Sequence, residues 1–148
     1  MSIKDQLKED LKSAMKDKDT IRKNVVQLIK AGVLQVEKDQ KVSLDDEGVL
    51  DVIARQLKQR RDSLPDYEKS GRTDLITQLK REMEILMGYL PAQLTPEELF
   101  EIVREAVEKT GAKTVKDMGK VMAEVMPKTK GRADGKEISK IARELLVG

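Results

Sequence analysis

Apolar residues recur at intervals of three and four along nearly the whole chain, and this period constrains the fold more than any other feature. No segment shows the strict apolar–polar alternation that is typical of a half-buried strand. The 148 residues include one Phe, two Tyr and no Trp, so the core must be aliphatic and methionine-based. Strands favour aromatic and β-branched residues, whereas this composition suits helices. The sequence therefore predicts an all-α protein.

The start of the chain predicts two consecutive helices. Ser2 and Asp5 have the spacing of a capping box for a helix that runs to Asp17. Asp19 opens a second helix, which is apolar over a broad arc and is therefore expected to pack on more than one side. Gly32 lies inside this second helix, where glycine costs about 1 kcal/mol relative to alanine. Its presence indicates that another helix passes close by.

Two further helices are expected before the first clear boundary. One follows residues 43–46, and residues 63–71, which include a proline and a glycine, are expected to turn the chain at its end. The next runs from Thr73 to about Tyr89. These four helices are predicted to form an N-terminal hairpin or bundle.

The clearest boundary is the segment Tyr89-Leu-Pro-Ala-Gln-Leu-Thr-Pro96. Its two prolines lie five residues apart, which forbids a continuous helix through the segment. We therefore expect an N-terminal helical subdomain over residues 1–91 and a C-terminal subdomain over residues 95–148.

The C-terminal part predicts a small three-helix bundle. Thr95, followed by proline, opens the first of its helices, and Gly111 ends it. Residues 114–117 open the second, which Pro127 is expected to stop. Asp134 caps the third. Together with the N-terminal helices, this gives an all-α chain in two parts.

The composition argues against several kinds of chemistry. The chain has no Cys and no His, so disulfides, thiolate metal sites, a cysteine nucleophile and the usual general base are all missing. It has no glycine-rich phosphate loop and no serine-rich amidase segment. The acidic group Asp45-Asp46-Glu47 is interpreted as the first turn of a helix because consecutive helical residues point in different directions. We expect no metal, no cofactor and no catalysis by the chain alone.

The hydropathy of the chain predicts where in the cell the protein is located. No apolar run approaches the ~20 residues of a membrane span, and no apolar stretch follows the first residues. The chain is therefore predicted to be cytoplasmic and to have no membrane partner. The formal net charge is only +2, so binding to a polyanion would have to come from a local patch.

Such a patch is predicted between the last two helices. The segment from Pro127 to Lys136 carries several cations against the single acid Asp134, and Gly131 and Gly135 allow a ligand to approach the backbone. A solvated loop with ordinary surface lysines is the alternative. The candidate RNA-binding residues are Lys128, Lys130, Arg132 and Lys136, with Lys120 and Lys140 on the flanking helices.

A second basic cluster is less specific. Its members are Arg55, Lys58, Arg60 and Arg61, which are distributed around a helix instead of forming one stripe. We expect these cations to pair with nearby acids such as Asp62, Asp66 and Glu68.

The segments Asp117-Met-Gly-Lys-Val-Met and Lys-Thr-Lys-Gly-Arg-Ala-Asp-Gly135 resemble a tail motif shared by the YqeY proteins and the B subunit (GatB) of the tRNA-dependent glutamyl/aspartyl amidotransferase. The YqeY pattern continues upstream, in the same order, over nearly the whole chain. One departure is Met122-Ala123, where many relatives have Met-Gly. The upstream matches are Lys58-Gln-Arg-Arg-Asp-Ser63, Tyr67, Gly71-Arg72 with Asp74-Leu75, and Glu84-Ile85 before Tyr89-Leu-Pro91.

The resemblance implies a role close to tRNA. In the amidotransferase the tail domain helps to hold tRNA, while the chemistry lies in other domains and subunits. By association, the family is often described as amidotransferase-like, a carbon–nitrogen ligase with glutamine as amido-N-donor. The leading hypothesis is therefore a non-catalytic adaptor that binds tRNA or another structured RNA. The alternatives are an accessory component of glutamine-dependent amide transfer and a module that binds a protein partner.

Overall fold

The computed structural model describes residues 1–146, and over this range the chain is all-α, as the sequence predicts. It divides into two compact units, Met1–Leu90 and a second that begins at Pro91. The helices are α1 (Ile3–Lys16), α2 (Thr20–Gln40), α3 (Asp46–Ser70), α4 (Thr73–Met87), α5 (Pro96–Thr110), α6 (Met118–Thr129) and α7 (Gly135–Leu145), with a 3-10 turn, η1 (Val115–Asp117), before α6.

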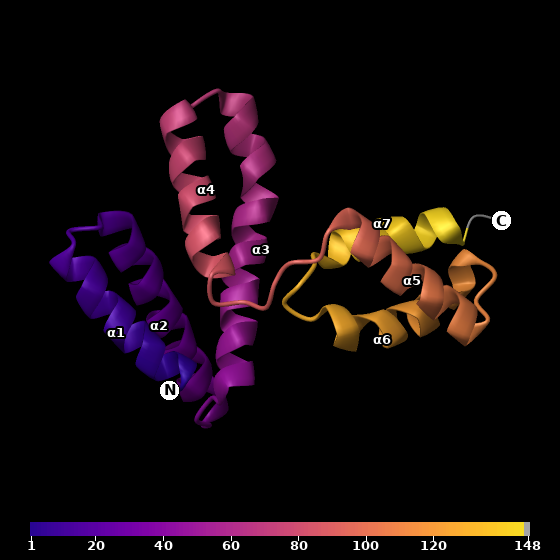
Figure 1. Cartoon of the computed structure of the whole chain (residues 1–148), viewed down its shortest axis with the longest axis horizontal. Coiled ribbons are helices and arrows are strands. Elements are labelled where there is room, and N and C mark those ends of the chain that lie inside the picture. Colours follow the sequence, from indigo (N-terminus) through magenta and orange to yellow (C-terminus); the bar gives the residue numbers. More distant parts are fainter. Residues whose placement is uncertain (147–148) are drawn as a thin grey trace. The chain divides into compact units, whose positions relative to one another are not determined.

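The N-terminal unit consists of two helical hairpins, α1–α2 and α3–α4 (Figure 1). Helix α2 packs against α1, α3 and α4, which explains its broad apolar arc. The buried core is aliphatic, with Tyr89 partly buried against it, and is formed by Leu7, Val25, Val26, Ile29, Val33, Val49, Val52, Ile53, Leu57, Leu86 and Leu90.

Gly32 lies at a close contact between α2 and α3. A Cβ atom at this position would lie 2.8 Å from Nε2 of Gln56 and 2.9 Å from Cγ1 of Val52. The Gln56 amide also donates a 3.0 Å hydrogen bond to the backbone oxygen of Leu28, one turn before Gly32. The close helix contact predicted from this glycine is confirmed.

The predicted turn over residues 63–71 is wrong. Helix α3 continues through Pro65 to Ser70 and ends only at Gly71, which has a φ of 68°. A proline inside a helix removes one backbone donor and costs about 3 kcal/mol in isolation. Here residues 65–70 are all exposed, and α3 nevertheless continues beside α4 to the turn that connects the two helices (Figure 1).

Glu37 connects three segments of the N-terminal unit. Its Oε2 atom accepts a 2.6 Å hydrogen bond from Nζ of Lys4 on α1 and a 2.7 Å bond from the backbone N–H of Leu44, just before α3. Both hydrogen bonds lower the pKa of Glu37, and the bond from Lys4 has the larger effect. The carboxylate therefore stabilises the fold in its ionised form.

A Glu37→Gln variant tests this contribution through its pH dependence. Because the folded-state pKa is below the ordinary value of 4.5, the stabilisation is fully present above about pH 4.5 and is lost as the pH falls through the lowered value. We expect the variant to melt at a lower temperature than the natural chain at pH 7, and the difference to shrink below pH 4. A difference that stays constant with pH, measured by circular dichroism, would contradict this assignment.

In the C-terminal unit, α5 packs against both α6 and α7 (Figure 1). Thr95 caps α5 by accepting a 3.1 Å hydrogen bond from the backbone N–H of Glu98, and Gly111 ends the helix with a φ of 67°, as predicted. The core is again aliphatic, formed by Leu99, Val103, Ala106, Val121, Val125, Ile138, Ala142 and Leu146.

Candidate nucleic-acid interface

The connection between α6 and α7 is shorter than the sequence predicts. We expected Pro127 to stop the helix, but α6 includes it and continues to Thr129. Gly131 then takes a φ of 71°, and Asp134 caps α7 by accepting a 3.1 Å hydrogen bond from the backbone N–H of Lys136. The predicted loop over residues 127–136 is therefore a tight turn over residues 130–134.

Thr129 is the last residue of α6, and its hydrogen bonds stabilise both the end of the helix after Pro127 and the turn that follows. Its side chain is 1% exposed, and its hydroxyl donates a 3.1 Å hydrogen bond to the backbone oxygen of Val125. The backbone oxygen of Thr129 accepts bonds from the N–H groups of Arg132 and Ala133 at 2.8 and 3.2 Å. These contacts hold the last residues of α6, which follow Pro127, in place.

Arg132 connects this turn to the segment before α5. Its Nε donates a 3.1 Å hydrogen bond to the backbone oxygen of Ala92, and its own backbone oxygen accepts a 2.9 Å bond from Leu94. Gln93 donates a further 2.8 Å bond to the backbone oxygen of Gly131. Arg132 was predicted only as a ligand contact, and the structure gives it a structural role as well.

Lys128 shares its counter-ion with another lysine. Its Nζ lies 3.5 Å from Oε1 of Glu124, and the same oxygen accepts a 2.8 Å hydrogen bond from Lys109 on α5. The Lys109 hydrogen bond is the main cause that lowers the pKa of Glu124. Since one carboxylate serves two ammonium groups and the Lys128 side chain is 48% exposed, Lys128 keeps positive charge at the surface.

Of the other lysines that were predicted to bind RNA, three lie at or near the turn between α6 and α7, and one lies further away. Lys130 and Lys136 are exposed at the two ends of the turn, and Lys140 is exposed one helical turn further along α7. Lys120 lies in the first turn of α6, about 12 Å along the helix from Lys128 at about 1.5 Å per residue. The term cationic turn refers below to Lys128, Lys130 and Lys136.

Helix α5 carries the opposite charge, which the sequence reasoning missed. Its glutamates are exposed and recur at three- and four-residue spacing, a signal that was readable from the chain. Only Arg104 compensates on the same face, at 2.9 Å from Glu101 and 3.2 Å from Glu108. An anion would therefore be repelled from α5, whose exposed acids are Glu97, Glu98, Glu101, Glu105 and Glu108.

Three of the four cations of the second basic cluster contact other polar groups of the chain. Lys58 lies 3.5 Å from Asp62, as predicted. Arg60 pairs instead with Glu82 on α4, at 2.9 Å, and both side chains are largely buried. We expected its partner among residues 62–68, but α4 folds back along α3 and brings Glu82 closer. Of the others, Arg61 also has a polar partner, and Arg55 is exposed.

The acidic group at the start of α3 is structural. Asp45 accepts a 2.9 Å hydrogen bond from the N–H of Gly48 as the helix cap, and Asp46 accepts a 2.9 Å bond from the N–H of Ile3 on α1. In the described part of the chain, no three acidic, His or Cys side chains gather as a metal site would require. None of the helices over residues 1–146 has the length and hydropathy to cross a bilayer.

Comparison with known proteins agrees with this architecture. The family model described as Yqey-like protein matches residues 4–146. A relative from Pyrenophora tritici-repentis, named altered inheritance of mitochondria protein 41, mitochondrial, is 29% identical over 147 residues, which cover 95% of this chain and 79% of that protein. Proteins of the same name from Lachancea thermotolerans and Kluyveromyces lactis are 36% and 39% identical over 57% and 58% of the chain. The aligned segments cover 46% and 47% of these two proteins, so this chain aligns with about half of each of them.

The fold and the candidate site define a class of small helical proteins with a basic turn between the last two helices. Within that class, the chain belongs to the YqeY family.

Proposed function

We propose that this protein is a non-catalytic adaptor that binds structured RNA, most simply tRNA, through the cationic turn of its C-terminal unit. One observation carries the proposal: Lys128, Lys130 and Lys136 gather at one inter-helix turn of a unit whose α5 face is acidic. This asymmetry would orient a polyanion toward the turn and away from α5. Lys140, on the next turn of α7, would extend the contact.

The contacts would be directed mainly at backbone phosphates. A single-strand stacking platform needs several accessible aromatic rings, and the chain has only Tyr67, Tyr89 and Phe100. The Tyr89 hydroxyl donates to the carboxylate of Asp10 inside the N-terminal unit, so it serves the fold. Four to six phosphate contacts would give salt-sensitive affinity on the order of micromolar near physiological salt.

A triple variant, Lys128→Gln, Lys130→Gln and Lys136→Gln, tests the proposal. We expect filter binding to unfractionated tRNA to weaken by about 30-fold at low salt. We also expect the slope of log affinity against log salt to fall by about 2 to 3 because about three phosphate contacts are lost. Arg132 is left unchanged because its bond to the Ala92 oxygen holds the turn.

The matched control removes three exposed cations of the same unit that were not predicted to contact RNA, with Lys113→Gln, Lys116→Gln and Arg143→Gln. It has the same net charge as the test variant, so it reports any effect of overall charge alone. Equal weakening by both variants would show non-specific attraction, and unchanged binding by the test variant would exclude the cationic turn as the RNA contact.

We further propose that a link to glutamine-dependent amide transfer, if present, is accessory. The chain has no Cys nucleophile, no His base and no serine-rich amidase segment, so ammonia release from glutamine by the purified chain would overturn this view. We place the RNA contact in the cytoplasm, although the relatives named above carry mitochondrial names. Fractionation of cells that express the tagged chain would distinguish the two locations.

A further inference from the structure

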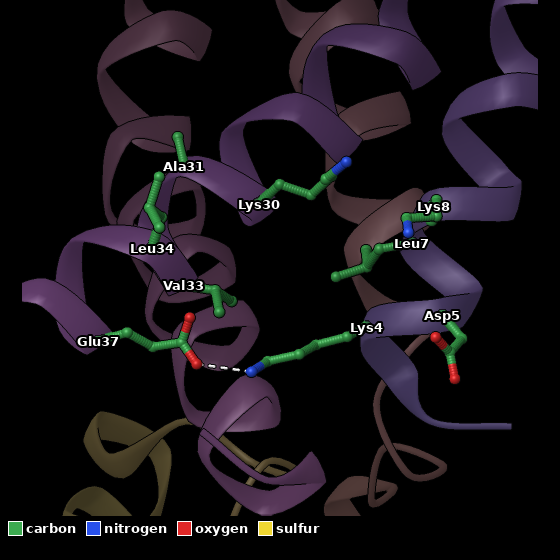
Figure 2. Close-up of a pocket in the computed structure, with 9 residues that line it drawn as sticks. All are labelled: Lys4, Asp5, Leu7, Lys8, Lys30, Ala31, Val33, Leu34 and Glu37. Carbon is green, nitrogen blue, oxygen red and sulfur yellow. Dashed lines mark hydrogen bonds and ion pairs between the residues drawn. The ribbon is translucent and has the colours of Figure 1, made fainter. Parts of the chain in front are cut away.

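A groove of about 530 Å³ lies between α1 and α2, within the N-terminal unit (Figure 2). Its floor is formed by Leu7 and Val33, which are 1% and 5% exposed and belong to the core. Leu34 borders the groove with 65% of its surface exposed. The middle of the groove is therefore apolar.

The two ends of the groove differ in charge. At one end, Lys4 reaches across from α1 to Glu37 on α2, and this 2.6 Å ion pair closes the groove (Figure 2). At the other end, Lys30 extends from α2 toward α1, where Lys8 lies (Figure 2). Within the described residues, neither Lys8 nor Lys30 has an acid within ion-pair distance.

Asp5 is the remaining acid of the groove lining, and it does not neutralise this end. Its carboxylate points away from α2 (Figure 2) and is held by Ser2 in the capping box of α1. The Ser2 hydrogen bonds are the main causes that lower the pKa of Asp5, with a smaller effect from Lys8. Lys8 and Lys30 thus leave a net positive charge beside an apolar floor.

The size of the groove indicates a small ligand. From Lys30 to Glu37 the groove follows about 10 Å of helix, at about 1.5 Å per residue. Its volume falls in the range of about 300–1,000 Å³ that is typical of small-molecule sites. A stable protein partner would need to bury about 1,000 Å² or more, and Leu34 is the only large, strongly exposed apolar side chain in the groove lining.

We propose that this groove binds a single-chain anionic amphiphile, specifically a medium-chain carboxylate. The carboxylate lies between the ammonium groups of Lys8 and Lys30, and the alkyl chain covers Leu7, Val33 and Leu34 toward the Lys4–Glu37 pair. Charge complementarity at one end and apolar burial along the rest determine both the class and the orientation of the ligand. The proposal does not depend on RNA binding.

The test is a titration of the full chain with decanoate below its aggregation concentration, followed by ¹H–¹⁵N NMR. We expect saturable shifts that are confined to the N-terminal unit and centred on Ala31, Val33 and Leu34. Octanoate should bind about fourfold more weakly than decanoate because two methylenes are removed from a half-open groove. Decyltrimethylammonium, which has the same chain and the opposite charge, should give no saturable shifts at these residues.

Two variants separate the charge from the apolar floor. Lys8→Gln with Lys30→Gln should weaken decanoate binding by at least tenfold, and Leu34→Gln, at an exposed position, by about fivefold. A matched control, Lys12→Gln with Lys38→Gln, removes two lysines from the same helices outside the groove and should leave binding unchanged. Equal shifts with the cationic amphiphile, shifts scattered over both units, or an unaffected lysine variant would each overturn the proposal. Loss of RNA binding by the cationic-turn variant would leave these results unchanged.

Discussion

A Gly32→Val variant is expected to lose about 3 kcal/mol of unfolding free energy in the N-terminal unit. The new Cβ would lie 2.8 Å from Nε2 of Gln56 and 2.9 Å from Cγ1 of Val52, both closer than real Cβ contacts allow. Overpacking of this kind costs about 1–3 kcal/mol. Displacement of Gln56 would also break its bond to the Leu28 oxygen, which adds about 1 kcal/mol. Urea unfolding followed by circular dichroism measures the loss.

Gly119→Ala is the control for glycine replacement itself. Gly119 also lies inside a helix, α6, but a Cβ there would meet nothing within 4 Å. Alanine should therefore stabilise the C-terminal unit by up to about 1 kcal/mol through its helix propensity. The tested claim is that the close α2–α3 contact requires glycine at position 32. An unchanged stability of Gly32→Val, together with a raised stability of Gly119→Ala, would contradict it.

The features that the sequence predicted well are local ones. The caps at Ser2, Asp19 and Thr95 each hydrogen-bond a backbone N–H three residues ahead, so their partners are fixed by spacing alone. The helical period likewise depends only on neighbours three and four residues away. This is why the all-α class and most helix starts could be predicted without knowledge of tertiary contacts.

The predictions that failed depend on contacts between distant segments. Pro65 and Pro127 were expected to end helices, but both helices continue past their prolines, and the buried Thr129 holds the end of α6. Proline propensity is a local tendency that tertiary packing can override. Similarly, the partner of Arg60 is 22 residues away, and Arg132 reaches across 40 residues to Ala92. No spacing rule identifies such pairs.

The candidate site shows the same division. The sequence located the cationic turn because its lysines lie close together in the chain, whereas the carboxylate shared by Lys109 and Lys128 appears only when α5 packs on α6. The groove between α1 and α2 has no sequence signature because its floor and its lysines come from two helices. Which cations remain available to a ligand is therefore decided by the tertiary structure.

Ile138→Ala should nearly unfold the C-terminal unit while the N-terminal unit remains folded. Ile138 is 1% exposed in a core of short aliphatic side chains, and truncation of a buried isoleucine costs about 2–5 kcal/mol. A unit of this size has a total stability on the order of 3–8 kcal/mol. The cationic turn immediately precedes α7, so RNA binding should fall with the helix even though every lysine is retained.

The adjacent exposed residue provides the control, since Glu137→Ala changes the same turn of α7 without a cavity and should alter stability by less than about 1 kcal/mol. NMR resonances of residues 91–146 should broaden or collapse in Ile138→Ala at 37 °C, while those of Leu7 and Ile53 keep their native positions. If both units melted together in this variant, the chain would be a single cooperative domain, because a cavity confined to the second core would then have destabilised the first.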